Sequence, residues 1–373
     1  MGEVFVVGVS SGRSGEQLGS AALAREAAQT ALEDAGVPGT AITAVFVGSG
    51  SHGRVPNVEA VAVRLGLRRL GLRAHRGGDE AAGAAGRVEC VSSSAVEALN
   101  RAFRAVELGI DDLVLCIGSE PDTAAALPWE SWPPREVLRA RACAARRYLA
   151  ASGTTATQLA RVVTKNRVHG AARGVVRELA LSDVVNGDVA EWPLTRPMVA
   201  GCGRGAAAVV LASARAARRL ARAGTRVRAS VLVAAGAHGD PEATVRAGRL
   251  AYGDAGLGPD DLDCAELHDA TAADELAAYE QLGIVPEGHA GELLDSGFTE
   301  AGGVLPVNLS GGLLSLGERP GAAAVAQVAE LTRQLRGDAS AHRVSGARAA
   351  LAHCAGRPGG AGGGVVGVTV LTL

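Results

Sequence analysis

The hydrophobic pattern at the start of the chain alternates between short apolar runs and one amphipathic stretch. Residues 4–9, VFVVGV, form an apolar run of strand length, which indicates a buried strand. Residues 20–35 carry apolar side chains at helical spacing and stop before Gly36, so they predict a helix. A second strand is expected at residues 43–48. This order of strand, helix and strand is typical of an α/β protein.

The same pattern recurs in the second half of the chain. Residues 30–49 and 250–269 share an Asp-Ala-Gly, a turn and a following apolar strand at a constant offset. The runs VFVVGVSSG at 4–12 and VLVAAGAHG at 231–239 precede the two copies as matching strands. Because strand, helix and turn agree together, we interpret the pattern as an internal duplication. A chain of 373 residues also exceeds what one hydrophobic core usually serves, which favours two packed halves.

Residues 120–195 differ in composition from the two halves of the chain. They contain all three tryptophans and an Arg-rich helical segment, REVLRARACAARRYLAASG. We interpret them as an inserted loop region, a kind of segment that often holds substrate over a rigid core. The domains expected on this basis are residues 1–119 plus 196–222 as the N-terminal half, 120–195 as the insertion and 223–373 as the C-terminal half.

Composition and charge narrow the class of protein without naming a reaction. The chain is 47% hydrophobic and only 3% aromatic, which is typical of a soluble α/β protein. A net charge of -2 creates no global field toward nucleic acid or an anionic membrane. Six cysteines without CxxC spacing argue against a disulfide framework or a zinc site, so no metal is expected. The apolar run at the N-terminus is too short for a signal peptide or membrane span, and we expect a cytoplasmic protein.

Cys90 is the first candidate for chemistry. It follows a short predicted strand and precedes a helix predicted from about Ser92 to Leu108. A thiol at a helix N-terminus is close to unpaired N–H groups and the positive end of the helix dipole, which lower its pKa and favour the nucleophilic thiolate. The same N–H groups can hold an acyl oxygen. The alternative interpretation is a buried structural cysteine, because free cysteines usually belong to the core.

Four segments, taken in order, resemble the thiolase superfamily, and in particular its sterol-carrier-protein type. The segment from Cys90 resembles the nucleophile region, in which a cysteine followed by small residues starts a buried helix. The segments ELHDATAADELAAYEQLGI (266–284), PVNLSGGLLSLGERPGAAAVAQ (306–327) and ALAHCAGRPGGAGGG (350–364) resemble its His-Asp, Gly-His-Pro and terminal Cys-x-Gly regions. The resemblance runs nearly end to end. It implies the thiolase fold, an α/β fold with a duplicated α/β/α/β/α five-layer architecture and a loop insertion.

The resemblance also implies roles for the matched positions. Cys90 takes the nucleophile position, His268 the position that binds the thioester oxygen, and Cys354 the acid/base position. Glu318 stands where the family has its activating histidine. Four further positions are expected to contact substrate or let the backbone approach it: Asn308, Ser310, Gly311 and Gly356.

Glu318 alters the chemistry that the resemblance implies. An ionised carboxylate near Cys90 would raise the thiol pKa, and each pKa unit lowers the thiolate population roughly tenfold. Three interpretations stay open. Glu318 is a general base whose pKa is raised by burial, or it pairs with Arg319 or another arginine while His268 or the helix dipole activates the cysteine. In the third interpretation the thiolase reaction is lost.

The sequence therefore predicts a thiolase-like acyltransferase. It would take an acyl group from a CoA or carrier-protein thioester onto Cys90 and pass it to a carbon or heteroatom nucleophile, in specialised biosynthesis. The alternatives are a retro-aldolase acting on a CoA thioester, which would not need Cys90, and a catalytically inactive scaffold subunit.

The same resemblance implies the partners. Coenzyme A or a carrier-protein thioester is expected as substrate, with no permanently bound cofactor. A homodimer is expected, and a small partner protein with a zinc ribbon and an OB fold is a further possibility. We expect no nucleic-acid partner and no membrane span.

Overall fold

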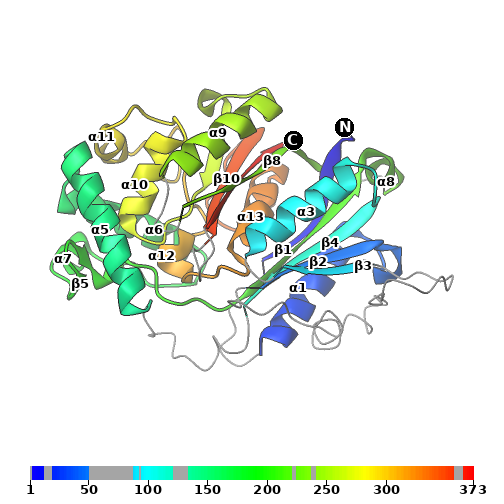
Figure 1. The fold of residues 1–373 in the computed structure, drawn as a ribbon, viewed down its shortest axis with the longest axis horizontal. Coiled ribbons are helices and arrows are strands. Elements are labelled where there is room, and N and C mark those ends of the chain that lie inside the picture. Colours follow the sequence, from blue (N-terminus) through cyan, green and yellow to red (C-terminus); the bar gives the residue numbers. More distant parts are fainter. Residues whose placement is uncertain are drawn as a thin grey trace.

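The computed structural model of the chain describes residues 2–11, 19–49, 87–91, 94–120, 133–220, 224–236, 241–356 and 364–373. Within these ranges one nine-stranded sheet runs in the order β3-β2-β4-β7-β1-β8-β11-β10-β9 (Figure 1). The N-terminal side of the sheet contains β1 (Val4–Ser11), β2 (Ala44–Ser49), β3 (Arg87–Val91), β4 (Leu113–Ser119) and β7 (Ala206–Ser213). The C-terminal side contains β8 (Thr225–Ala234), β9 (Cys264–Glu266), β10 (Ala349–Gly356) and β11 (Val365–Thr372).

The two sides of the sheet repeat one pattern of strand directions. On the N-terminal side β3, β2 and β4 are parallel, and β4–β7 and β7–β1 are antiparallel. On the C-terminal side β9 and β10 are parallel, and β10–β11 and β11–β8 are antiparallel. Val307 forms a parallel bridge to Ala265 of β9, at the place that β3 occupies in the first half. This repetition is what a duplicated unit requires, while the proposed domain boundaries stay a prediction.

The helices of the described residues complete the layers. They are α1 (Ser20–Ala35), α3 (Ala95–Glu107), α5 (Arg135–Ser152), α6 (Ala156–Ala172), α7 (Leu181–Val185), α8 (Ala214–Arg219), α9 (Pro241–Ala255), α10 (Ala272–Gln281), α11 (Ala290–Asp295), α12 (Gly312–Leu316) and α13 (Ala323–Arg336). Three short 3-10 turns lie at Gly39–Ala41, Arg196–Met198 and Pro259–Asp261, and a small hairpin pairs β5 (Val189–Glu191) with β6 (Leu194–Thr195).

Alternation of side chains along the strands separates three hydrophobic cores. One core packs α3 and α13 between the N-terminal and C-terminal strands, in the middle of the molecule (Figure 1). The second packs α1 and α8 on the outer face of the N-terminal strands, and the third packs α9 and α10 on the outer face of the C-terminal strands. Helix, strand, helix, strand and helix layers therefore follow one another, as the resemblance to thiolases predicted.

The elements predicted at the N-terminus are confirmed to within two residues. The helix matches its predicted bounds, and Gly36 ends it in the left-handed conformation that glycine favours. The helix predicted from about Ser92 instead begins at Ala95, with Ser94 as an extended N-cap. Residues 92–93 lie outside the described residues.

The segment expected as an inserted loop region is mainly helical in its described part, 133–195. It forms α5, α6 and α7, because the spacing of Leu159, Val162 and Val163 gives α6 a buried apolar face. Thr155 and Gln158 begin α6 with a capping box. Trp129 and Trp132 lie outside the described residues.

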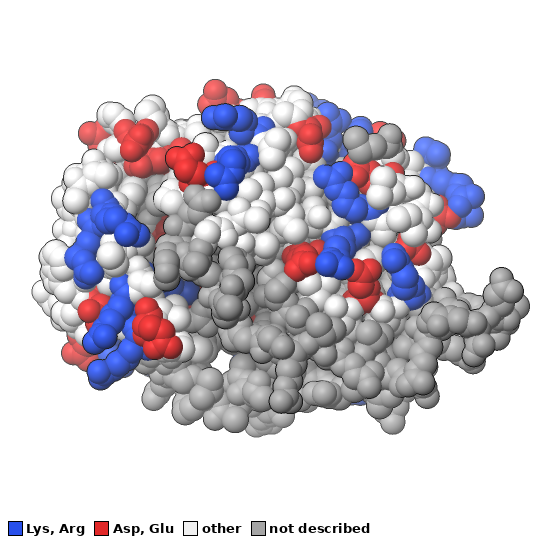
Figure 2. All heavy atoms as spheres, in the orientation of Figure 1, with Lys and Arg blue, Asp and Glu red and all other residues white. Residues whose placement is uncertain are grey.

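Acidic and basic side chains are interspersed over the face drawn in Figure 2. Among the described helices, none is both long enough and apolar enough to span a bilayer.

Candidate active site

Two of the predicted site residues meet at the end of neighbouring parallel strands. Ala352 of β10 is in register with Glu266, the last residue of β9. Cys354 and His268 each lie two residues further along the chain, so strand alternation directs both side chains to the same side. The Cys354 Sγ lies 3.9 Å from the His268 Nδ1, and the strand register therefore assembles this pair.

Burial sets the protonation of both groups. It lowers the pKa of His268, opposed by the charges of Glu318 and Asp274, so the imidazole favours its neutral form. Burial, together with Glu318, raises the pKa of Cys354 to about 12. The contact thus joins a neutral imidazole to a protonated thiol, an arrangement suited to proton transfer rather than to nucleophilic attack by a thiolate.

Glu318 is held by an arginine from the middle segment of the chain. Its Oε2 lies 2.7 Å from the Nη2 of Arg141 on α5, and both side chains are largely buried. The Glu318 backbone N–H donates to the Gly201 carbonyl, and its own carbonyl accepts from the Gly203 N–H. Glu318 therefore forms its ion pair with Arg141 rather than with the adjacent Arg319.

Cys90 lies on a strand and packs in a different hydrophobic core from Cys354, contrary to its expected place at a helix start. It is inside β3, paired with Val47 of β2, and packs with the core beneath α1. Cys354 belongs to the core around α3 and α13, on the other face of the strands. Burial, followed by the charge of Glu89, raises the pKa of Cys90 to about 11, the opposite of the predicted lowering. The reason is that β3 continues to Val91, which places residue 90 on a strand instead of at a helix dipole.

The four positions expected to contact substrate have partners within the protein. The Asn308 side chain accepts from the Leu267 N–H, 2.7 Å between the nitrogen and Oδ1. The Ser310 hydroxyl donates to Glu266, 2.5 Å between the two oxygens. Gly311 adopts a φ of 95° and a Cβ there would lie 2.8 Å from the Cα of Gly170. Gly356 ends β10, paired with Val365. Their substrate contacts stay a prediction.

A cavity of about 470 Å³ opens beside His268. Its wall comes from α5, α9 and α10 and from the ends of β8, β10 and β11. Polar groups in the wall include Tyr148, Thr244, Asp274, His268 and His353. Burial lowers the pKa of His353 to about 3, so that imidazole is neutral as well. Within the described residues, no group of His, Cys, Asp and Glu side chains is arranged to hold a metal ion.

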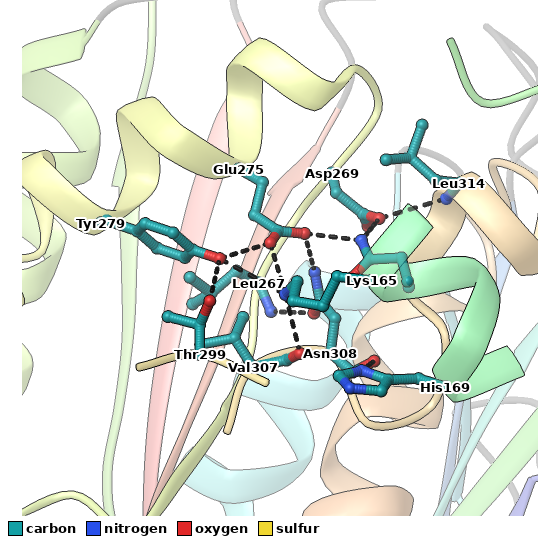
Figure 3. A network of polar contacts seen from close by, with 12 residues as sticks. Lys165, His169, Leu267, Asp269, Glu275, Tyr279, Thr299, Val307, Asn308 and Leu314 are labelled. Carbon is teal, nitrogen blue, oxygen red and sulfur yellow. Dashed lines mark hydrogen bonds and ion pairs between the residues drawn. The ribbon is translucent and has the colours of Figure 1, made fainter. Parts of the chain in front are cut away.

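Sequence patterns missed the residues that support this cluster. Arg141 is one of many arginines in α5, and no spacing separates it from the solvated ones. Asn166 and Lys165 on α6 reach a buried network around Glu275, which lies one helical turn from Tyr279 (Figure 3). Polar residues at buried positions of α6 are a signal for such a network, but only after the buried face of the helix is known.

Comparison with known proteins points consistently to one family. The family described as "Thiolase C-terminal domain-like" matches residues 225–366. Acetyl-CoA acetyltransferase of Methanothermobacter thermautotrophicus is 32% identical over 96% of this chain and 98% of that protein. Benzoylsuccinyl-CoA thiolase subunit BbsB of Thauera aromatica is 30% identical over 95% of this chain and 94% of that protein. Sterol carrier protein 2 of Rattus norvegicus is 49% identical over 31% of this chain and 21% of that protein.

Solved structures share the fold over the whole chain. A structure titled "Ltp2-ChsH2(DUF35) aldolase" superposes with a TM-score of 0.78 at 20% identity, covering 100% of this chain and 98% of that one. Human mitochondrial 3-ketoacyl-CoA thiolase superposes with a TM-score of 0.74 at 16% identity, with the same coverage. At these identities the likeness concerns the arrangement of elements rather than the reaction.

Proposed function

The chain belongs to the thiolase superfamily, and we propose that it is a thioester-dependent carbon–carbon lyase of the retro-aldol type, with His268 and Cys354 at its centre. The substrate would be a β-hydroxyacyl thioester of CoA or of a carrier protein. The observation that supports this proposal is the 3.9 Å contact between the Cys354 thiol and the His268 imidazole, with Cys90 packed on the opposite face of the strands.

Proton transfer is the chemistry that this pair can perform. A protonated thiol with a raised pKa is a poor nucleophile, but it can deliver a proton to a carbanion, which is a strong base. A neutral His268 can donate an N–H to the oxygen of an enolate, which is where negative charge develops. A retro-aldol cleavage needs both functions and no acyl-cysteine.

The residues of the cluster can carry out every proton transfer that the retro-aldol cleavage requires. The Glu318 carboxylate removes the proton of the β-hydroxyl group, and the bond between Cα and Cβ breaks. Cβ leaves as a carbonyl compound, and the electron pair stays on Cα as an enolate delocalised onto the thioester oxygen. His268 stabilises that oxygen, and Cys354 protonates Cα. Proton return from Glu318 to the Cys354 thiolate restores the enzyme.

The cavity beside His268 would hold the acyl part of such a substrate next to the imidazole, while Cys354 and Glu318 are not among the described residues of its wall. Its volume of about 470 Å³ lies in the usual range of small-molecule sites. Four acidic residues of its described wall, Glu242, Asp274, Glu280 and Glu287, outnumber the one arginine, Arg147. The anionic nucleotide of CoA is therefore expected outside this cavity.

The decisive experiment compares cysteine variants on a panel of β-hydroxyacyl-CoA and carrier thioesters, with carbonyl product and shortened thioester quantified by mass spectrometry. Cys90→Ala should retain cleavage, whereas Cys354→Ala should abolish it. His268→Ala should lower kcat by roughly 10²–10³, the usual effect of losing an oxyanion donor. Loss of turnover in Cys90→Ala, with its fold intact, would contradict the proposal.

Acyl transfer through Cys90 is the second candidate, because a relative named as an acetyltransferase matches nearly the whole chain at 32% identity. Intact-protein mass after incubation with acyl thioesters distinguishes the two. A stable acyl adduct on the wild type and none on Cys90→Ala would favour the transferase. If the folded protein gives no acyl adduct and no cleavage, the catalytically inactive scaffold is favoured.

We also propose that the protein is cytoplasmic and has two partners: a second copy of the chain, and a small protein with a zinc ribbon and an OB fold. One relative is named as a subunit, and one structural neighbour is titled as an assembly of two named proteins. Light scattering of the purified chain, alone and after co-expression with such a protein, tests both partners. A monomer that binds no such protein would rule them out.

A further inference from the structure

Both residues that flank His268 are anchored by buried polar contacts (Figure 3). On one side the Leu267 N–H donates to the Asn308 Oδ1, 2.7 Å from the nitrogen. On the other side Asp269 accepts the N–H groups of Leu313 and Leu314 at the start of α12, at 2.6 and 3.2 Å. The residues on each side of the histidine are thus held in place, while its imidazole contacts the Cys354 thiol.

The two anchors converge on one carboxylate. The Asn308 Nδ2 donates to Glu275 Oε2 over 2.7 Å. The Asn166 Nδ2 donates to the same oxygen over 2.6 Å and to Asp269 Oδ2 over 2.9 Å. Asn166 comes from α6, in the middle segment of the chain, and it is the side chain that joins Asp269 directly to Glu275.

Asp269 and Glu275 are both fully buried, and Asn166 is a neutral donor between them. Burial and the charge of Glu275 raise the pKa of Asp269 well above its ordinary value, so the two acids avoid carrying adjacent charges. Lys165, which precedes Asn166, compensates one of them through an ion pair of 2.7 Å with Glu275 Oε1. For Asp269 the side-chain donor in the network is Asn166, because Lys165 is directed to Glu275, Tyr279 and the Val307 carbonyl.

Contacts of the α6 backbone add to this coupling. The Ser315 hydroxyl of α12 donates to the Asn166 carbonyl over 2.9 Å. Helix α12 ends at Leu316, two residues before Glu318. Helix α6 is therefore connected to Glu318 as well as to His268. Displacement of α6 would therefore move His268 through Asp269 and the Glu318 segment through α12.

We propose that Asn166 is a positioning residue for His268. By donating to Asp269 and Glu275 together, it fixes the backbone of residues 267–269 so that the imidazole stays in contact with the Cys354 thiol. The expected effect of Asn166 on turnover rests on the function proposed above for His268 and Cys354. The expected effect of Asn166 on the position of the His268 imidazole is independent of that function.

The test uses Asn166→Ala, the milder Asn166→Ser and a matched control, Asn100→Ala. Asn100 lies on α3 and likewise donates its amide to a neighbouring strand, at the Ser230 carbonyl over 2.8 Å, but it does not belong to the network. The primary readout is the imidazole ¹⁵N chemical shifts of ¹⁵N-histidine-labelled protein, in which the chain's eight histidines are assigned by single substitutions. Exposed His289 serves as the internal reference.

In a folded Asn166 variant we expect the His268 shifts to move, while those of His289 stay in place and Asn100→Ala resembles the wild type. With a thioester that the wild type turns over, kcat should fall on the order of 100-fold with little change in KM, the loss that a displacement of a catalytic group by about 1 Å can cause. Unmoved His268 shifts in either folded variant would overturn the proposal. Moved shifts in a protein without lyase turnover would support it and count against the proposed function alone.

Discussion

At the scale of single residues, burial is the strongest influence on the chemistry of this protein. Glu266, behind Ser310, is fully buried, and burial together with Glu330 raises its pKa to about 7. The same cause raises the pKa of Cys354 and lowers that of His268. At neutral pH Cys354 and His268 therefore favour their neutral forms, which suits proton transfer in a dry site, whereas Glu266 is near the midpoint of its titration.

Glu266 makes the stability of the protein dependent on pH. Its folded pKa of about 7 exceeds the ordinary 4.5, so the folded state binds the proton more tightly. The stabilisation is complete below pH 4.5 and is lost as pH rises through 7. Compared with Glu266→Gln, the wild type should lose roughly 1–3 kcal/mol of unfolding free energy between pH 5 and pH 8.

Urea denaturation of both proteins at several pH values measures this difference, with the exposed Glu287→Gln as control. An unchanged gap between wild type and Glu266→Gln across that range would show that the carboxyl does not titrate there.

At the scale of elements, two loops cross at glycines beside the candidate site. Gly317 ends α12 with a φ of 78°, and a Cβ there would lie 2.5 Å from the Cα of Gly203. The close approach lets the Glu318 backbone bond to Gly201 and Gly203. A glycine before Glu318 is therefore required by the crossing as well as by the turn.

Gly317→Ala should be markedly destabilising, because it adds a backbone clash to the strain of the left-handed conformation. Gly109→Ala is the matched control, since Gly109 has a φ of 70° and no atom within 4 Å of the added Cβ. The control should lose about 1–2 kcal/mol, the usual strain of the left-handed conformation. Gly317→Ala should lose at least about 1 kcal/mol more, the lower end of the cost of overpacking. Equal unfolding free energies for the two variants would show that the crossing relaxes freely.

At the scale of the whole molecule, the candidate site joins two parts of the chain that lie far apart in sequence. Arg141 of α5 and Asn166 of α6 come from the middle segment, whereas His268, Glu318 and Cys354 come from the C-terminal half. Folding of the middle segment onto that half therefore completes the site.

The Arg141–Glu318 ion pair should contribute to this association. Glu318→Gln leaves the Arg141 charge buried without its carboxylate, so the unfolding free energy should fall by about 3–5 kcal/mol. Glu318→Gln combined with Arg141→Met should recover part of the loss, because neither charge of this pair then remains buried. A double-mutant cycle by denaturation measures the coupling. Strictly additive effects of the two substitutions would show that the pair adds nothing to the stability of the fold.

From the sequence alone, the resemblance of four segments to thiolases indicated the family and the layers, and apolar periodicity predicted the first three elements to within two residues. Helix α1 was predicted to the residue. His268, Glu318 and Cys354 were singled out as candidates from their motifs, and the structure brings these three into one cluster.

Tertiary structure alone decided which residues support that cluster and what state they are in. The predicted place of Cys90 at a helix start was wrong, because β3 extends through Cys90 to Val91 and directs the thiol to the core beneath α1. Arg141 and Asn166 could not be singled out, because their partners lie 177 and 103 residues away along the chain. A contact of that separation depends on how the layers pack, and local patterns carry no record of it.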